Sequence, residues 1–399
     1  RQLRAGRGQG GRGCALRRSR LVWSEHRESA LPDSTWDAVT KCDAVKLTSE
    51  GHVSPGRRFL FVIPPFHGHL NPAIAIAREL MEQHHEVAWV TSTSVRDSLP
   101  DGAQVYDSIE NGYERSFAKT LELTAMPRGE QFYAYYRDLV LPGAIASLDD
   151  VMRGCADFNP DVLLVDQHAL AGAIAARRLN LPWATSAPSQ QMMNPLGRLI
   201  QPWIDEHIAE LGQSCGVQDL KEVSDALILS YTSSLLVPAG SAPAQVRFVG
   251  PAIDLRRGFD RLRLSLLHPG RRVLVSLSTV YGDEGDAFLL RLGQVLQTIG
   301  IQGLFSSSNL DLAGLPAPAV VRPWLPLLSL MPHVDAVVSH GGANTAHEAL
   351  YFGKPLIFAP LAFDNFAVAQ AVVSAGAAIR VRPRRATERD IARVIEQIL

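Results

Sequence analysis

The stretch that decides the fold is Asp335-Ala336-Val337-Val338-Ser339-His340-Gly341-Gly342-Ala343-Asn344-Thr345-Ala346-His347-Glu348. Its apolar start predicts a buried strand, and the helical pattern behind it ends at Gly353-Lys354-Pro355. N–H groups in the first turn of a helix have no partner within the helix, and the helix dipole makes this end partly positive. The two glycines let a phosphate approach the backbone closely. The stretch therefore predicts an anion site on a parallel α/β sheet.

The composition is that of a globular protein long enough for two domains. The chain has 399 residues, of which 46% are hydrophobic and 20% are charged. The formal net charge of −1 provides no global field for nucleic acid, so we expect no nucleic-acid partner. No apolar run is long enough for a transmembrane helix. The four cysteines are scattered without a CxxC pair or metal spacing, which favours the reducing cytoplasm.

The chain divides into four parts. Residues 1–56 begin rich in Arg and Gly and show no sustained apolar period, so we expect a disordered leader; a transit segment or a nucleic-acid arm is the alternative. We expect an N-terminal domain over 57–249, a linker over 250–269 and a C-terminal domain over 270–399. No C-cap glycine follows the last helical pattern, so we expect the second domain to be truncated at its end.

Both domains alternate apolar strands with amphipathic helices. We expect strands at 58–64, 86–91, 160–166, 181–185, 226–229 and 246–249 in the first domain, and at 272–277, 302–306, 335–339 and 355–359 in the second. This alternation predicts an α/β fold with two doubly wound, Rossmann-like parallel sheets. Ligands of such sheets bind beyond the carboxyl ends of the strands. We therefore expect loops 65–70 and 340–344 to face each other across a cleft.

His69 is the candidate general base. It lies in the loop 65–70, with Asn71 expected as the N-cap of the next helix and Pro72 at its first position. A neutral imidazole at a strand end can take a proton from a hydroxyl near neutral pH. A solvent-facing loop histidine is the alternative. His67 is the rival base, and the pair is weak evidence for a metal site.

Asp166 is the candidate partner of His69. It ends an apolar strand, so its carboxylate is expected at the same sheet edge, where it could bond the second ring nitrogen of His69. The alternative is that Asp166 caps the helix expected at about 169–179.

Polar side chains near the glycine loop suit a nucleotide sugar. Gly341, Gly342, Asn344 and Thr345 would hold a diphosphate at a helix start, and Glu348 could accept hydrogen bonds from a ribose. The alternative is a turn without a ligand, in which Thr345 and Glu348 form a capping box.

Trp324 and Asp364 are the remaining candidates from the residues themselves. The indole of Trp324 could stack on a nucleobase or could lie in the core. The carboxylate of Asp364, past another strand end, could accept hydrogen bonds from vicinal sugar hydroxyls or could cap the helix that begins near Asn365.

Together these motifs resemble the UDP-glycosyltransferase superfamily of the GT-B fold, including its bacterial macrolide-glycosyltransferase-like members. The resemblance covers about residues 57–399. The matching segments are Phe66 to Pro72, Val249 to Pro251, Trp324 to Pro326, His340 to Thr345, Glu348 to Leu350, Gly353 to Pro355 and Pro360 to Asn365.

The resemblance implies a general base at His69 with Asp166 as its partner. It implies donor-binding roles for Thr279, Trp324, Leu325, His340, Gly341, Gly342, Asn344, Thr345, Glu348, Asp364 and Asn365. Within this set Trp324 stacks on the base, Thr279 lies near the phosphates, and Asp364 with Asn365 binds the sugar. Leu327 and Asn365 each stand where many members carry glutamine, and Ser278 stands where a glycine is usual. These departures leave open whether the donor is a UDP- or a dTDP-sugar.

The resulting hypothesis is an inverting transfer of a hexose from the nucleotide sugar to a hydroxyl of a lipophilic small molecule. No metal and no cofactor besides the nucleotide sugar is expected. The predicted acceptor-side segments are 112–136 and 188–202. In and next to them lie Phe117, Met126, Phe132, Tyr133, Tyr136, Met192, Met193 and Trp203, which equally suit a core. A nucleotide-sugar epimerase of the same fold and a non-catalytic nucleotide-sugar binder are the alternatives. The sequence does not set the oligomeric state.

Overall fold

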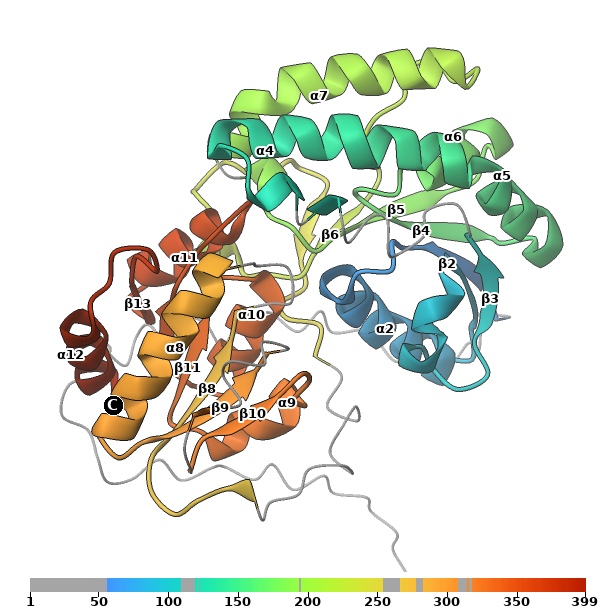
Figure 1. Cartoon of the computed structure of the whole chain (residues 1–399). Helices are drawn as coiled ribbons and strands as arrows, with labels where there is room; N and C mark the ends of the chain where they lie inside the picture. Colours follow the sequence, from blue (N-terminus) through green and yellow to red (C-terminus); the bar gives the residue numbers. More distant parts are fainter. Residues whose placement is uncertain are drawn as a thin grey trace, which may run out of the picture.

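The computed structural model describes residues 56–108, 119–120, 122–193, 195–253, 266–277, 283–307, 314–315 and 318–399. These residues form two lobes, each built on a parallel sheet (Figure 1). Seven strands form the first sheet in the order β3-β2-β1-β4-β5-β6-β7, and six form the second in the order β10-β9-β8-β11-β12-β13. The predicted leader falls outside the described residues, apart from Gly56.

Helices cover both faces of the first sheet. Its strands are β1 (Arg58–Val62), β2 (Glu86–Thr91), β3 (Gln104–Asp107), β4 (Val162–Asp166), β5 (Trp183–Ala187), β6 (Ile228–Ser230) and β7 (Val246–Phe248). In β1, Leu60 and Val62 pack toward α5 (Leu141–Phe158), α6 (Leu170–Leu179) and α7 (Pro195–Ser214). Phe61 points to the other face, toward α2 (His67–Glu82). Figure 1 shows α5, α6 and α7 on the side of this sheet opposite α2. Burial on both faces explains why the strands read as continuous apolar runs.

The second lobe repeats this arrangement. Its strands are β8 (Arg272–Ser276), β9 (Gln302–Ser306), β10 (Val320–Arg322), β11 (Ala336–Ser339), β12 (Leu356–Phe358) and β13 (Ala378–Arg380). Helices α8 (Asp283–Thr298) and α12 (Glu388–Ile398) cover one face. Helices α9 (Leu327–Leu330), α10 (Ala343–Tyr351) and α11 (Asn365–Ser374) cover the other. The prediction of two doubly wound sheets is confirmed.

Some predicted elements have the bounds that the structure shows, and some elements of the structure were not predicted. The strands at 86–91 and 302–306 and the helix at 365–374 coincide with β2, β9 and α11. The sequence analysis left α5, α7, β3, β10, β13 and the helix α4 (Arg128–Tyr135) unassigned. A helical signal exists in α5, because its buried residues Ala144, Leu148, Val151 and Cys155 are spaced by three or four. The predicted linker and domain limits stay predictions, since residues 254–265 lie outside the described part.

None of the helices in the described ranges combines the length and the apolarity that crossing a bilayer requires. This finding agrees with the prediction made from the sequence.

Gly172 lets α6 lie directly on the strands that lead into the site. A Cβ at this position would lie 2.7 Å from Val165 Cγ1 and 3.1 Å from Val62 Cβ. Val165 precedes Asp166, and Val62 precedes the turn into α2. The absence of a side chain at Gly172 therefore fixes how closely the helix approaches the two strands.

We expect Gly172→Ala to lower the free energy of unfolding by about 1–3 kcal/mol, since overpacking a closed core forces the backbone to shift. Urea denaturation measures the change. Gly129→Ala in α4 is the matched control, because no atom lies within 4 Å of its Cβ position. Alanine there should raise helix stability by up to about 1 kcal/mol. Equal stability of Gly172→Ala and the wild type would contradict the close approach of α6.

Candidate active site

His69 lies in the first turn of α2, not in a loop. The predicted loop over 65–70 with Asn71 as N-cap is wrong, because α2 begins at His67 with Phe66 as its N-cap. The strand β1 also ends earlier than predicted, at Val62. The backbone of His69 is therefore part of a helix.

Pro72 lies inside α2. Proline has no N–H, so it cannot donate to the carbonyl of Gly68 four residues earlier. The side chain of Asn344, in the first turn of α10, donates to this carbonyl from the second lobe at 3.1 Å. Because Pro72 does not donate to the Gly68 carbonyl, this oxygen can accept a hydrogen bond from the second lobe.

His69 and Asp166 form the predicted hydrogen bond. Nδ1 of His69 lies 2.8 Å from Oδ2 of Asp166, whose residue is 1% exposed. The other carboxylate oxygen accepts from the backbone N–H of His168 at 2.9 Å. The alternative in which Asp166 caps α6 is not observed, since the N-cap is Ala169 and has no side-chain cap.

Opposing effects set the pKa of His69. Burial alone lowers this pKa, but the charge and hydrogen bond of Asp166 raise it, and the charge of Asp364 adds to the rise. The net result is a pKa above its ordinary value of 6.5. Asp364 belongs to the second lobe, so both lobes contribute to the protonation of the candidate base.

The glycine loop joins β11 to α10. Gly341 has a φ of 98°, and a Cβ there would lie 2.6 Å from the carbonyl oxygen of Asn365. Only glycine fits this position. Its N–H donates to Ser339 Oγ at 3.2 Å. Gly342 is the N-cap of α10 and makes no side-chain cap, so the first-turn N–H groups are left for a ligand.

The capping-box alternative for Thr345 and Glu348 is wrong. Thr345 lies inside the first turn of α10, three positions after the N-cap. Glu348 is one turn further into the helix, and burial raises its pKa to about 7. The cause of this rise is burial, and a carboxyl group whose pKa is perturbed in this way is a candidate for a ligand contact.

His340 lies against the loop. A Cβ on Gly342 would come within 2.5 Å of His340 Nε2, so the missing side chain makes room for the imidazole. Burial lowers the pKa of His340 to about 4, against a hydrogen bond to the Ser276 backbone that raises it. His340 is therefore neutral near pH 7 and approaches a ligand as a hydrogen-bonding group.

Side chains link the two lobes around this crevice. Ser189 Oγ donates to Asp364 Oδ2 at 2.9 Å. The buried Thr232 Oγ1 lies 2.9 Å from His347 Nε2. The backbone N–H of Phe363 donates to Gln131 Oε1 at 3.1 Å. The hydrogen bond from Asn344 to the Gly68 carbonyl therefore brings the start of α10 close to the first turn of α2, which carries His69.

The remaining donor-site candidates differ in their exposure. Trp324 is 67% exposed, which excludes the core alternative, whereas Leu325 is 7% exposed and packs in the core. Asp364 is the N-cap of α11 but makes no capping bond with its side chain. Asn365 is buried, and its Nδ2 lies 3.4 Å from Asp364 Oδ1. Thr279 lies outside the described residues.

The sequence analysis missed His168 and Tyr135. Tyr135 Oη lies 3.2 Å from His168 Nδ1, and the ring of His168 lies 5.4 Å from that of His69. Burial, with the nearby charge of His69, lowers the pKa of His168 to about 3. The sequence does contain one indication of His168 as a site residue, because it lies two residues past the predicted end of a strand.

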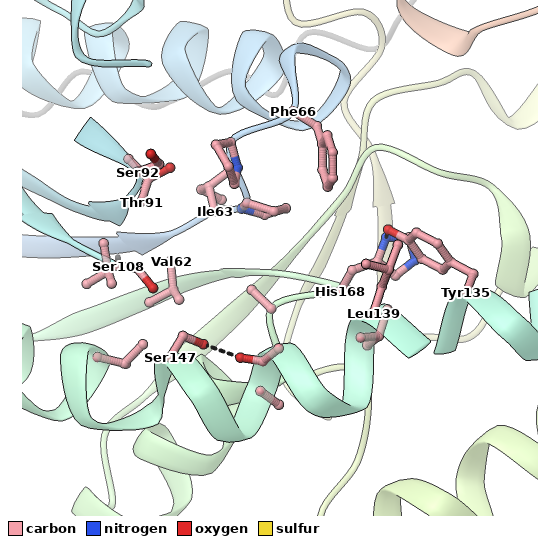
Figure 2. A pocket seen from close by; sticks show the side chains of 18 residues that line it. Val62, Ile63, Phe66, Thr91, Ser92, Ser108, Tyr135, Leu139, Ser147 and His168 are labelled. Carbon is pink, nitrogen blue, oxygen red and sulfur yellow. Dashed lines mark hydrogen bonds between the residues drawn. The ribbon is translucent and has the colours of Figure 1, made fainter. Parts of the chain in front are cut away.

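A cavity of about 90 Å³ opens beside this group (Figure 2). Tyr135, His168 and Phe66 line it together with the ends of β1 and β2. The predicted acceptor residues are not among those that line it. Phe132, Tyr136 and Met193 are core residues, and Tyr133 packs edge-to-face on Trp203. Phe117 lies outside the described residues.

The chain is similar in sequence to one protein-family model and to known enzymes. Residues 291–399 match the family model for the C-terminal domain of erythromycin biosynthesis protein CIII-like proteins. The chain is 25% identical over 395 residues to 4'-demethylrebeccamycin synthase of Lentzea aerocolonigenes, covering 86% of this chain and 92% of that protein.

Solved structures share the fold. The glycotransferase of kitacinnamycin superposes with a TM-score of 0.71 at 21% identity, covering 86% of this chain and 91% of that one. The spinosyn rhamnosyltransferase SpnG complexed with thymidine diphosphate gives a TM-score of 0.67 at 22% identity and the same coverage. Residues 291–399 therefore carry this C-terminal domain, and over 86% of its length the chain is similar to natural-product glycosyltransferases and shares their fold, which supports an enzyme of that kind.

Proposed function

We propose that the chain is an inverting hexosyltransferase that uses a UDP- or dTDP-sugar and a hydroxyl of a lipophilic small molecule. One observation carries the proposal: the His69–Asp166 pair, 2.8 Å apart, lies next to the carbonyl of Gly68, which bonds Asn344 of the glycine loop at 3.1 Å. A proton acceptor and an anion-binding helix start therefore meet in one crevice.

The reaction is a single displacement. Asp166 occupies Nδ1 of His69, so Nε2 is left to take the acceptor proton. As the acceptor oxygen forms its bond to the anomeric carbon, the bond from that carbon to the diphosphate oxygen breaks. Attack opposite the leaving group inverts the anomeric carbon. The proton ends on His69, and the diphosphate leaves with the bonding electrons.

The start of α10 would stabilise the leaving diphosphate. Its N–H groups and dipole are fixed before the reaction, so they favour the charge that develops without having to reorient. The amide of Asn344 has two hydrogens, of which Gly68 accepts one, so the other can reach a phosphate oxygen. Trp324 would stack on the base, Glu348 would bind the ribose, and Asp364 with Asn365 would bind the sugar.

We propose that no metal takes part. Ligand atoms of His69, Asp166 and His168 lie within 4.8 Å of one another, a spacing that would suit an ion. Both oxygens of Asp166 already accept hydrogen bonds, and His168 Nδ1 lies 3.2 Å from Tyr135 Oη. These contacts favour use of the group for proton transfer. The buried free thiols Cys155 and Cys215 support a cytoplasmic location.

The relatives support this substrate class. The first relative is named as a synthase of 4'-demethylrebeccamycin, and the SpnG structure holds thymidine diphosphate. A screen of UDP- and dTDP-sugars against phenolic, macrolide and carotenoid-type alcohols, read by mass shift, tests donor and acceptor together. Donor alone serves as the control for the epimerase alternative, since an isomerised sugar without acceptor would support an epimerase.

We expect His69→Ala to keep the affinity for the nucleotide and to lose about 10²- to 10⁴-fold in the turnover of the transfer, because general-base assistance is worth that much. Calorimetry measures binding and mass spectrometry measures the product. His67→Ala is the matched control, since this exposed histidine lies two residues away in the same turn. Near-normal turnover in His69→Ala would place the base at His67 or elsewhere.

We expect Asp166→Asn to move the acid limb of the pH profile to lower pH. Transfer needs neutral His69, so activity rises with pH through the His69 pKa, which Asp166 holds above 6.5. Removing the charge lowers this pKa, while loss of orientation lowers the plateau rate by about 10²- to 10⁴-fold. NMR titration of the imidazole measures the shift independently of turnover. An unmoved titration would show that Asp166 does not set the protonation of His69.

We expect Glu348→Gln to weaken donor binding about tenfold and to raise the melting temperature at pH 8. The folded-state pKa of about 7 exceeds the ordinary 4.5, so the wild type loses stability as pH rises between these values. Glutamine removes this loss, and the difference should vanish toward pH 5. The exposed Glu396→Gln serves as the control. A melting temperature that is unchanged at both pH values would refute the burial of an unpaired carboxyl group.

A further inference from the structure

Two buried hydroxyls in the cavity wall lack partners. Thr91 ends β2, and Ser108 directly follows β3, on the neighbouring strand. The residues are 2% and 7% exposed, and neither Thr91 Oγ1 nor Ser108 Oγ has a hydrogen-bond partner in the part of the chain that the structure describes. Both line the cavity.

Other hydroxyls in the same wall are already engaged. Ser147 Oγ donates to the carbonyl of Gly143 at 2.7 Å, within α5. Ser92 Oγ accepts from the backbone N–H of Ser94 at 3.2 Å. Among the described hydroxyls that line this cavity, only those of Thr91 and Ser108 therefore lack a partner; Ser230, Ser241 and Ser329 lack one elsewhere in the described part of the chain.

An unsatisfied buried hydroxyl destabilises the folded chain, and such groups are uncommon in proteins. Thr91 and Ser108 border a space that a ligand can enter, so a ligand atom can supply the missing partner. Hydroxyl groups both donate and accept, so a carbonyl, hydroxyl or amide group would satisfy them, whereas a hydrocarbon would not.

The cavity is polar at two ends and apolar between them. Figure 2 shows Tyr135 and His168 at one end and Thr91, Ser92 and Ser108 at the other. The labelled apolar side chains between these ends are Val62, Ile63 and Phe66, and Leu139 lies beside Tyr135 and His168. The end with His168 lies next to His69, where the reacting hydroxyl would be placed.

We propose that Thr91 and Ser108 select acceptors that carry a second polar group, a hydroxyl, carbonyl or amide, at the end remote from the hydroxyl that receives the sugar. The acceptor class is then an oxygenated ring system with an apolar middle, not a hydrocarbon with a single alcohol. This inference rests on the proposed function in treating the cavity ligand as the sugar acceptor.

Matched acceptor pairs test the inference. Each pair shares a small aromatic skeleton of one or two rings with one reacting phenol, and only one member carries a hydroxyl or carbonyl at the far end. Calorimetry measures binding to the full chain, and mass spectrometry with a UDP- or dTDP-sugar measures transfer. In at least one pair the oxygenated member should bind about 10- to 100-fold more tightly, since leaving buried hydroxyls unpaired costs about 1–3 kcal/mol.

The double variant Thr91→Val with Ser108→Ala should reduce the ratio of the two affinities, oxygenated member over plain phenol, to about threefold or less. It should still bind the plain phenol. Ser147→Ala is the matched control, and it should leave the ratio near that of the wild type because its hydroxyl is already used in α5. The melting temperature of the ligand-free double variant should match or exceed that of the wild type, which shows that it is folded.

The outcomes separate the two proposals. A ratio near one in the wild type, a ratio that survives in the double variant, or no binding of any member would overturn the inference. A binding preference that the double variant loses, without any sugar transfer, would leave the inference standing and overturn the proposed function.

Discussion

A carboxylate buried at the end of β4 is the constraint on which the crevice depends. Asp166 is almost wholly removed from water, so its charge must be matched by donors. The imidazole of His69 and the N–H of His168 supply them. Folding of the first lobe thus already orients His69, and the close approach of α6 at Gly172 holds the strand that carries Asp166. The candidate base is placed by the same packing that stabilises the sheet.

The second lobe completes this arrangement through a few polar contacts. Pro72 leaves the Gly68 carbonyl open, and Asn344 fills it, which sets the glycine loop beside the turn that carries His69. Asp364 reaches across to Ser189 and raises the pKa of His69. These contacts between the lobes are single hydrogen bonds, whereas each lobe has its own apolar core. The electrostatics of the base consequently depend on how closely the lobes approach each other.

The sequence predicted the central strands and the position of the glycine loop between β11 and α10 well, for a physical reason. Central parallel strands are buried on both faces, so β2 and β9 read as apolar runs with clear limits. The start of α2 was misplaced because Pro72 is typical of a first helical position, and the sequence does not show that another lobe satisfies Gly68. Helices α5 and α7 were missed, although α5 has a regular apolar spacing.

The donor side is easier to read from sequence than the acceptor side because the two sites are built differently. A diphosphate always needs hydrogen-bond donors and positive charge, and a short loop such as Gly341–Gly342 can supply donors from its backbone N–H groups. The acceptor cavity is assembled from side chains at separate strand ends, including Thr91 and Ser108, which only the sheet topology brings together. Residues chosen for being aromatic fell instead into the core, as Tyr136 did. Acceptor specificity is therefore better inferred from polar atoms in the cavity wall that lack partners than from segments rich in apolar side chains.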